Sequence, residues 1–286
     1  MNQITERAYA KINLALDVLR RRPDGYHDVR MVMQTVHLYD KLTLSKSREP
    51  GISLKTNLPF LPGNENNLVY RAIDLFCKTY GIDCGIRATL EKRIPIAAGM
   101  AGGSSDAAAA FRAMNELFHI NASLEDLQAL GVKLGADIPY CIIGGTALAE
   151  GIGEKLTALP AAPACSCLIV KPNFHLSTKL VYENLTLDDP SAHPDIDAML
   201  DAVHTNSYKQ MTSSIGNILE TVSIRLYPEI AEIKQEMLAL GADCSLMSGS
   251  GPSVFGLFEH RQVAERAYRK FRLGPYGKQT FLSYLR

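Results

Sequence analysis

The chain has 286 residues, of which 47% are hydrophobic, so it can bury a sizeable core but is long for a single domain. Lysine plus arginine equals aspartate plus glutamate at 30 each, which argues against nucleic acid or an anionic membrane surface as a partner. None of the six cysteines forms a CxxC pair. The sequence also shows neither a secretory leader nor an apolar run of about 18 residues. We therefore expect a two-domain protein of the cytoplasm.

Alternating residue character near the start predicts a strand over residues 9–18. Its apolar positions fall on one face, and Lys11 and Asn13 share the opposite face. Taken alone, Lys11 is typical of a solvated lysine on a strand. The sequence Pro-Asp-Gly at 23–25 predicts a turn, and strands are expected over 29–45 and 52–56.

Helices and strands follow in mixed order through the rest of the first half. Residues 64–67 lead into a helix that ends near Gly81. We expect a strand over 87–94, helices over 105–118 and 123–134, and a strand over 140–148. The segment LTALPAAPA, residues 156–164, is typical of a linker, so the predicted domains are 1–160 and 161–286.

The second half combines separated strands with runs of helices, which favours an α+β domain. Strands are expected at 167–171, around the sequence SLMSGSGPSVFGLF, and at 279–284. Helices are expected near 178–185, 195–205, 209–226, 228–240 and 262–271.

The segment IPIAAGMAGGSSDAAAA, residues 94–110, places glycines and serines directly before an alanine-rich helix. A helix N-terminus carries unpaired N–H groups and partial positive charge, so a glycine-rich approach to it lets the backbone close around a phosphate. The alternative is a tight turn with a serine cap. The segment has neither the Gly-Lys-Ser/Thr ending of a Walker A loop nor the GxGxxG spacing of a dinucleotide site.

Two further segments carry polar groups between apolar elements. LGADIPYC places Asp137 before Ile138-Pro139, where the alternative interpretation is an aspartate that caps a turn or helix. MSGSGPSVFGLF, from Met247, holds a second Gly/Ser turn between apolar strands, and its alternative is an ordinary hairpin turn.

Together these segments resemble the GHMP small-molecule kinases, which have a lysine-bearing first strand, a PxxxGxxxGSS phosphate loop and a C-terminal SGSGPS loop. The corresponding segments here are AKINLAL, Pro95 through Ser105, and the turn after Met247. Four segments together, AKINLAL, RRPDGYHDV, KRIPIAAGMAGGSSDAA and LGADIPYC, narrow the likeness to the GHMP kinases that act on a cytidylyl alcohol in the non-mevalonate isoprenoid route. The resemblance implies a two-domain α+β fold with the active site in a cleft between the domains. Ala101 stands where relatives usually have glycine, which argues against a required positive φ there.

The resemblance also implies roles for individual residues. Asp137 would be the general base, Lys11 would keep it ionised and offset phosphoryl charge, and Asn13 would orient the substrate hydroxyls. Ser105 would contact Mg²⁺. The ATP-binding positions implied are Pro95, Ala97, Gly99, Met100, Ala101, Gly102, Gly103, Ser104 and Ser105, with Lys92 and Asn67 around the adenine.

The implied partners are ATP and a small cytidylyl substrate. Tyr26 and Tyr182 would grip the cytosine ring, while His27 and Thr178 would contact its polar edge. Gly249 and Ser250, followed by Gly251, would close the far side of the cleft. The resemblance leaves a homodimer open.

Two rival functions remain at this level. One is another GHMP kinase, acting on homoserine, a mevalonate derivative or a sugar. The other is a nucleic-acid-binding protein, because the N-terminal fold of the family resembles one found in translation proteins. Zero net charge and the lack of interleaved aromatic and basic residues argue against the second.

Overall fold

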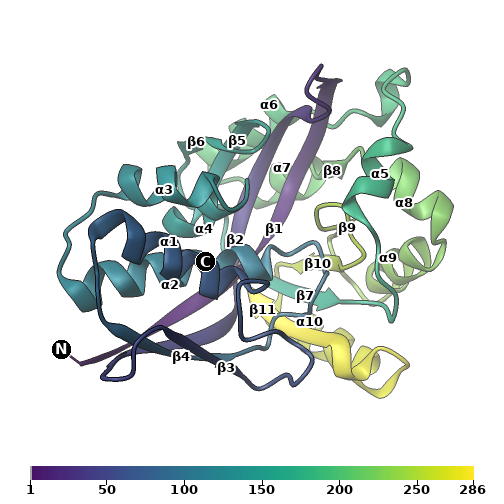
Figure 1. Cartoon of the computed structure of the whole chain (residues 1–286). Helices are drawn as coiled ribbons and strands as arrows, with labels where there is room; N and C mark the ends of the chain where they lie inside the picture. The colour runs from purple at the N-terminus through teal and green to yellow at the C-terminus, as the bar shows by residue number, and fades with distance from the viewer. Residues whose placement is uncertain (1) are drawn as a thin grey trace. The chain divides into compact units, whose positions relative to one another are not determined.

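A computed structural model describes residues 2–286 (Figure 1). The chain forms two compact units, each assembled from separate stretches of sequence. Unit 1 contains the described residues up to Ala10, then Leu38–Ile96 and Ala101–Gly144. Unit 2 contains Lys11–His37, Ala97–Met100 and Gly145–Arg286. The units thus divide the chain at several points, whereas the domains expected from the sequence, 1–160 and 161–286, stay a prediction.

Two long strands, β1 (Gln3–Arg21) and β2 (His27–Ser47), contribute residues to both units. In unit 1, residues 41–47 of β2 pair antiparallel with β4 (Gly85–Glu91). Strand β4 in turn pairs in parallel with β3 (Ile52–Thr56).

Four helices complete unit 1, and local signals explain where several of them start and stop. They are α1 (Leu68–Tyr80), α2 (Gly102–Phe118), α3 (Leu124–Val132) and α4 (Ile138–Ile143). Asn67 caps α1 by accepting a hydrogen bond from the Val69 amide, and Gly81 ends it with φ of 65°. A capping box of Ser123 and Asp126 starts α3.

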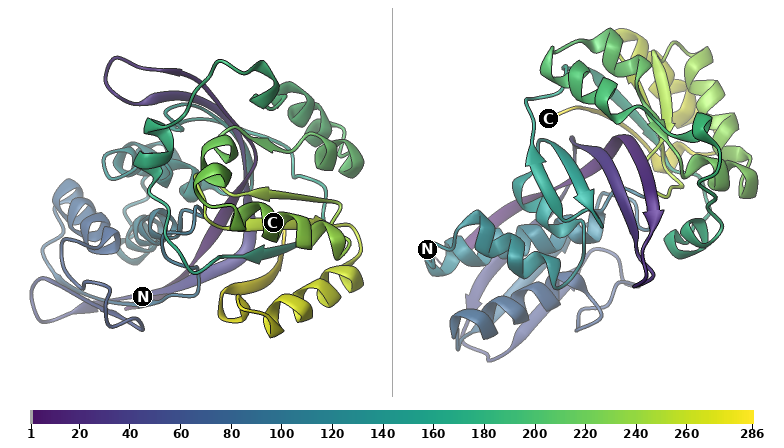
Figure 2. Two further views of the ribbon diagram at one scale, coloured as in Figure 1. Left: turned by 90° about the vertical axis from the view of Figure 1, so that its right-hand side faces the viewer. Right: turned by 90° about the horizontal axis from the view of Figure 1, so that it is seen from above.

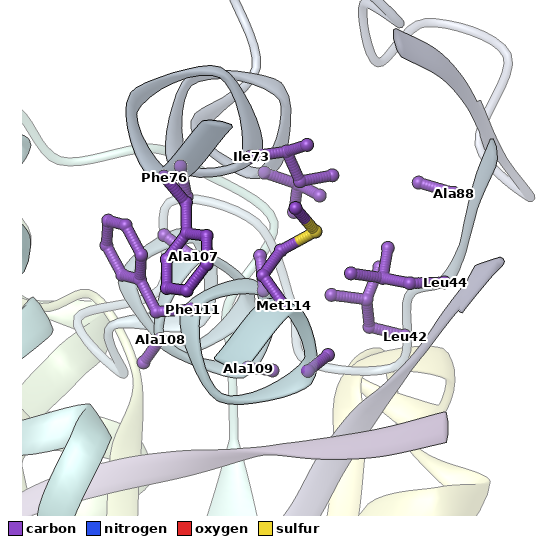
Figure 3. Close-up of a cluster of buried hydrophobic side chains, with 14 of the residues drawn as sticks. Leu42, Leu44, Ile73, Phe76, Ala88, Ala107, Ala108, Ala109, Phe111 and Met114 are labelled. Carbon is purple, nitrogen blue, oxygen red and sulfur yellow. The ribbon is translucent and has the colours of Figure 1, made fainter. Parts of the chain in front are cut away.

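The core of unit 1 lies between α1, α2 and the strands (Figure 3). Phe76 of α1 lies beside Phe111 of α2, and Met114 of α2 lies between these rings and Leu42 and Leu44 of β2. The run of four alanines from residue 107 to 110 is fully buried. Such small side chains let α2 approach its neighbours α1 and α4 closely, so α2 is held rigidly at the centre of the unit.

Unit 2 contains two sets of paired strands. Residues 29–34 of β2 pair antiparallel with β5 (Thr146–Gly151), which pairs with β6 (Lys155–Ala158). Strand β8 (Gly216–Asn217) runs parallel to β1 beside Ala15 and Leu16. A separate four-stranded antiparallel sheet has the order β11 (Thr280–Tyr284), β7 (Ser166–Val170), β10 (Val254–Phe258), β9 (Cys244–Met247).

Helices α9 and α10 pack against this four-stranded sheet, and Figure 2 shows α10 in yellow beside it. The helices of unit 2 are α5 (Thr178–Glu183), α6 (Ile196–His204), α7 (Tyr208–Ser213), α8 (Glu220–Leu226), α9 (Glu229–Ala239) and α10 (Arg261–Leu273), with short 3₁₀ helices at Pro190–Ala192 and Gly277–Gln279. Within residues 2–286, no helix combines the length and apolar character needed to cross a membrane.

The α+β class is confirmed, and most elements lie where the sequence predicts them. Three predictions are wrong. The first part of the linker expected over 156–164 belongs to β6, which pairs with β5. Residues 140–148, expected as one strand, form the end of α4 and the start of β5. The single helix expected over 209–226 is α7 and α8 separated by β8, because the short strand β8 pairs with β1.

Candidate active site

Lys11 and Asn13 lie side by side on β1, and both are buried, with exposed fractions of 5% and 0%. The Lys11 ammonium donates a hydrogen bond to Asn13 Oδ1 at 2.8 Å. The interpretation of Lys11 as a solvated lysine on a strand is therefore wrong, since its side chain is buried. Because the Asn13 amide is neutral, it does not balance the charge of the buried Lys11 ammonium, which can therefore bind an anion.

The loop before α2 turns through left-handed backbone conformations. Ala97, Gly99 and Ala101 have φ values of 50°, 72° and 53°. The expectation that Ala101 needs no positive φ is thus wrong, since this alanine adopts the conformation that glycine takes more easily. In unit 2, Met100 accepts a backbone hydrogen bond from Lys11, at 3.2 Å, which ties the loop to β1.

Helix α2 begins at Gly102 without a side-chain cap, so the serine-cap alternative is wrong. Ser105 instead lies inside the helix, where its hydroxyl donates to the Tyr9 carbonyl at 2.6 Å. Ser104 is half-buried in the first turn, and Gly103 is exposed. The first N–H groups of α2 are therefore left for a ligand.

The second Gly/Ser loop meets the first within unit 2. The Ser248 hydroxyl donates to the Gly99 carbonyl at 2.9 Å. A side chain at Gly249 would lie 3.0 Å from the same carbonyl and 3.6 Å from Asn13 Oδ1. Asn217 holds the loop, because its amide donates to the carbonyls of Met247 and Gly249 at 2.9 and 2.7 Å. The loop joins the paired antiparallel strands β9 and β10, as the hairpin-turn alternative expects, and it makes these contacts in addition.

Lys92 is buried rather than exposed, with its ammonium between Asp40 and Asp106 in unit 1. Burial alone would lower the pKa of Lys92, but the charges of Asp106 and Asp40 raise it. Burial raises the pKa of Asp106 well above its ordinary value, against the pull of Lys92. Lys92 is therefore a charged group fixed in place.

Asn67 and Asp137 both lie at helix starts in unit 1, with different surroundings. The Asn67 side chain is used by the backbone, accepting from Val69 and donating to the Pro62 carbonyl at 2.9 Å each. Asp137 precedes α4 but makes no side-chain cap. Among the described residues of unit 1, its half-buried carboxylate makes no hydrogen bond or ion pair, so it is available as a proton acceptor.

The residues expected around the cytosine ring lie in unit 2. His27 and Tyr182 are in ring contact, with centroids 5.0 Å apart and planes tilted by 41°. Tyr26 is 60% exposed. The hydroxyls of Thr178 and Ser250 lie 2.7 Å apart, which joins the start of α5 to the second Gly/Ser loop.

Comparison with known proteins identifies the family to which this arrangement belongs. The model of the GHMP kinases N terminal domain matches residues 67–145, and the GHMP kinases C terminal model matches residues 190–275. The chain belongs to the GHMP kinase family. This GHMP kinase is 60% identical over 99% of its length to 4-diphosphocytidyl-2-C-methyl-D-erythritol kinase of Lachnoclostridium phytofermentans, covering 97% of that protein. It is 44% identical to the protein of the same name from Bacillus subtilis, over 94% of this chain and 93% of that one.

Solved structures agree. A crystal structure of 4-(cytidine 5'-diphospho)-2C-methyl-D-erythritol kinase matches this GHMP kinase with a TM-score of 0.84 and 35% identity, covering 99% of both chains. Homoserine kinase from Cytophaga hutchinsonii matches with a TM-score of 0.75 at 21% identity, over 99% of this chain and 94% of that one, which shows a shared fold.

Sequence reasoning missed three buried polar residues of this GHMP kinase: Asp40, Asp106 and Asn217. A signal was present for Asp40, which shares the strand face of Leu42 and Leu44, where a lone carboxylate needs a partner. Across residues 2–286, no group of three or more His, Cys, Asp or Glu side chains could hold a metal ion.

Proposed function

We propose that this GHMP kinase transfers the γ-phosphate of ATP to the 2-hydroxyl of 4-diphosphocytidyl-2-C-methyl-D-erythritol, in the non-mevalonate route to isoprenoid precursors. The high identity to relatives of that name supports the substrate. The observation that carries the chemistry is the loop 97–101, whose left-handed turns deliver the chain to the uncapped start of α2.

The phosphates of ATP are expected to bind at this helix start. The first-turn N–H groups of α2 point outward from the helix and carry the positive end of its dipole. Gly102 and Gly103 present no side chain in front of those groups. We infer that Gly99 contributes differently, by allowing the loop to pass close to the Ser248 carbonyl.

The transfer needs a base for the hydroxyl proton and positive charge for the migrating phosphoryl group. We assign the base to Asp137: its carboxylate takes the proton as the substrate oxygen forms a bond to phosphorus and ADP leaves. We assign charge stabilisation to Lys11, which donates to the neutral Asn13 and retains ammonium hydrogens for an anionic oxygen. Asn13 would also orient the attacking alcohol.

Mg²⁺ belongs to the proposal, since it would neutralise charge on the ATP oxygens. Ser105, the Mg²⁺ contact implied by the resemblance, does not fit that role well, because it is 1% exposed inside α2 and its hydroxyl donates to the Tyr9 carbonyl. Mg²⁺ is commonly held by substrate phosphates with few protein ligands, so a dedicated acidic cluster is not required.

Base recognition is assigned to the His27–Tyr182 pair. Burial, followed by the charge of Arg21, lowers the pKa of His27, which keeps the imidazole neutral at physiological pH. A neutral imidazole offers one donor and one acceptor to a pyrimidine edge. Tyr26, exposed next to His27, is left free to stack on the ring from outside.

The proposal is tested by incubating the purified protein with ATP, Mg²⁺ and single alcohols, followed by mass analysis of the products. The alcohols are the cytidylyl methylerythritol, homoserine, mevalonate and a hexose. Phosphorylation of the cytidylyl alcohol alone is the expected result. Preferred phosphorylation of any other alcohol would overturn the substrate assignment.

All six cysteines are free thiols, which supports the cytoplasmic location that we infer.

A further inference from the structure

A buried cluster of three ionisable residues lies next to the two ends of the phosphate loop. Lys92 follows β4, Asp106 lies on α2, and Asp40 lies on β2, so three elements of unit 1 meet there. The exposed fractions of these side chains are 5% or less. We call this cluster, Asp40–Lys92–Asp106, the clasp.

Both carboxylate oxygens of Asp40 accept hydrogen bonds within the clasp or from the backbone beside it. One of its oxygens accepts from the Lys92 ammonium. The other accepts from the backbone N–H groups of Arg93 and Ile94, the latter at 2.8 Å. Asp40 thus fixes both the lysine and the backbone where the chain leaves β4 for the loop.

Lys92 carries this restraint across to α2. Its ammonium donates to Asp106 Oδ2 at 2.6 Å, while Asp106 Oδ1 has no partner among the described residues. The ammonium also lies behind the helix start, since a side chain at Gly102 would come within 3.4 Å of Nζ. The backbone at Ile94, before the loop, and Asp106 of α2, after the loop, are therefore both hydrogen-bonded to this buried cluster.

We propose that Asp40 is a positioning residue for ATP, acting through the clasp to hold the phosphate loop in its binding conformation. This rests on the proposed function of the loop as the ATP phosphate site. Holding both ends reduces the conformations that the loop must give up when the phosphates bind. Because Lys92 is buried and paired with two carboxyl groups, we expect the clasp to act on the nucleotide through the position of the loop, and so on affinity for its phosphates.

Asp40→Asn is the sharpest test, because an amide of the same shape cannot accept hydrogen bonds both from Lys92 and from the backbone N–H groups of Arg93 and Ile94. Its oxygen can accept from the backbone or from Lys92, but its other edge donates. The variant is expected to fold, since Lys92 keeps its hydrogen bond to Asp106. We expect the KM for ATP and the Kd for ADP to rise about tenfold, as loss of charged hydrogen bonds implies. The inhibition constant of adenosine and the KM for the alcohol should stay unchanged.

Glu6→Gln is the matched control, since Glu6 pairs with Arg112 of the same helix α2 at 3.1 Å, away from the loop ends. It should leave the KM for ATP unchanged. An Asp40→Asn protein with lower thermal stability but normal affinity for ADP would overturn the proposal, as would an equal loss for adenosine and ADP. If Asp40→Asn fails to fold, Asp106→Asn takes its place, with an expected severalfold rise in the Kd for ADP, and an unchanged Kd would overturn the proposal. ADP binding by calorimetry does not depend on the alcohol, so failure of the substrate assignment is seen separately.

Discussion

His193 Nδ1 lies 2.7 Å from Asp17 Oδ1, and the other ring nitrogen of His193 lies 3.3 Å from the Leu187 carbonyl. Both ring nitrogens thus face oxygen acceptors, and both can donate only when the imidazole is protonated. Because Asp17 is buried in β1, the charged pair ties the segment before α6 to the strand that carries Lys11.

This pair predicts a pH dependence of stability. Burial alone would lower the pKa of His193, but the hydrogen bond to Asp17, the Leu187 carbonyl and the Asp17 charge raise it. A raised pKa in the folded state gives stability that is complete below the ordinary histidine pKa, about 6.5, and is lost as pH rises through the folded value. NMR titration should place the His193 midpoint above that of a free histidine. Asp17→Asn should lower the midpoint, and an unchanged midpoint would contradict the assigned pair.

Ala101→Gly should raise the free energy of unfolding. A φ of 53° costs an alanine about 1 to 2 kcal/mol, and glycine removes this cost. Glycine also increases the conformational entropy of the unfolded chain, which offsets part of the gain. The expected net gain is about 0.5 to 1 kcal/mol. Ala109→Gly, inside α2, is the control and should cost about 2 kcal/mol, from lower helix propensity and the loss of a buried methyl group. Chemical denaturation measures both, and a loss of stability in Ala101→Gly would contradict the strain argument.

Gly99→Ala should raise the KM for ATP about tenfold or more and lower thermal stability, because both the backbone conformation and a close neighbour oppose the added methyl group. Its φ is 72°, and the added carbon would lie 2.2 Å from the Ser248 carbonyl oxygen. Gly51→Ala separates the two causes, since Gly51 has φ of 87° but no atom within 4 Å. In steady-state kinetics, the KM of Gly51→Ala for ATP should equal that of the unsubstituted protein. Similar kinetics in the two variants would mean that the contact between the Gly/Ser loops is unimportant.

Local sequence signals predict the fold where the cause is local. Asn67 and Gly81 bound α1 because a cap and a left-handed glycine act within one turn of the helix. Local signals fail for α4, because its β-branched and aromatic residues favour a strand. Pro139 at the helix start and burial in unit 1 stabilise a short helix instead. Local signals also fail for Lys92, because its partners Asp40 and Asp106 are 52 and 14 residues away. Only the folded chain brings such charges together.

Asp137→Asn should lower kcat by about 10² to 10⁴ while ATP binding is retained, as expected for loss of a general base. Lys11→Met should lower kcat by about 10² to 10³. If both groups act on the same transfer step, the double variant loses less than the product of the two single losses. Single-turnover measurements check this, with ADP affinity as the control for intact nucleotide binding. A fully multiplicative loss would mean that the two residues act independently.

Substrate choice should depend on the contact between His27 and Tyr182, whose ring centroids are 5.0 Å apart. Tyr182→Ala should raise the KM for the cytidylyl substrate about tenfold or more, as loss of one stacked ring implies, and leave the KM for ATP unchanged. His27→Ala should instead reduce the preference for cytidine over uridine analogues, because the polar reader of the pyrimidine edge is lost. Tyr26→Ala tests whether the exposed Tyr26 ring also stacks on the base. A tenfold rise in the KM for the cytidylyl substrate would show that it does. Equal weakening of ATP and cytidylyl substrate in Tyr182→Ala would contradict base recognition, since a ring that only packs unit 2 has no reason to favour one substrate over the other.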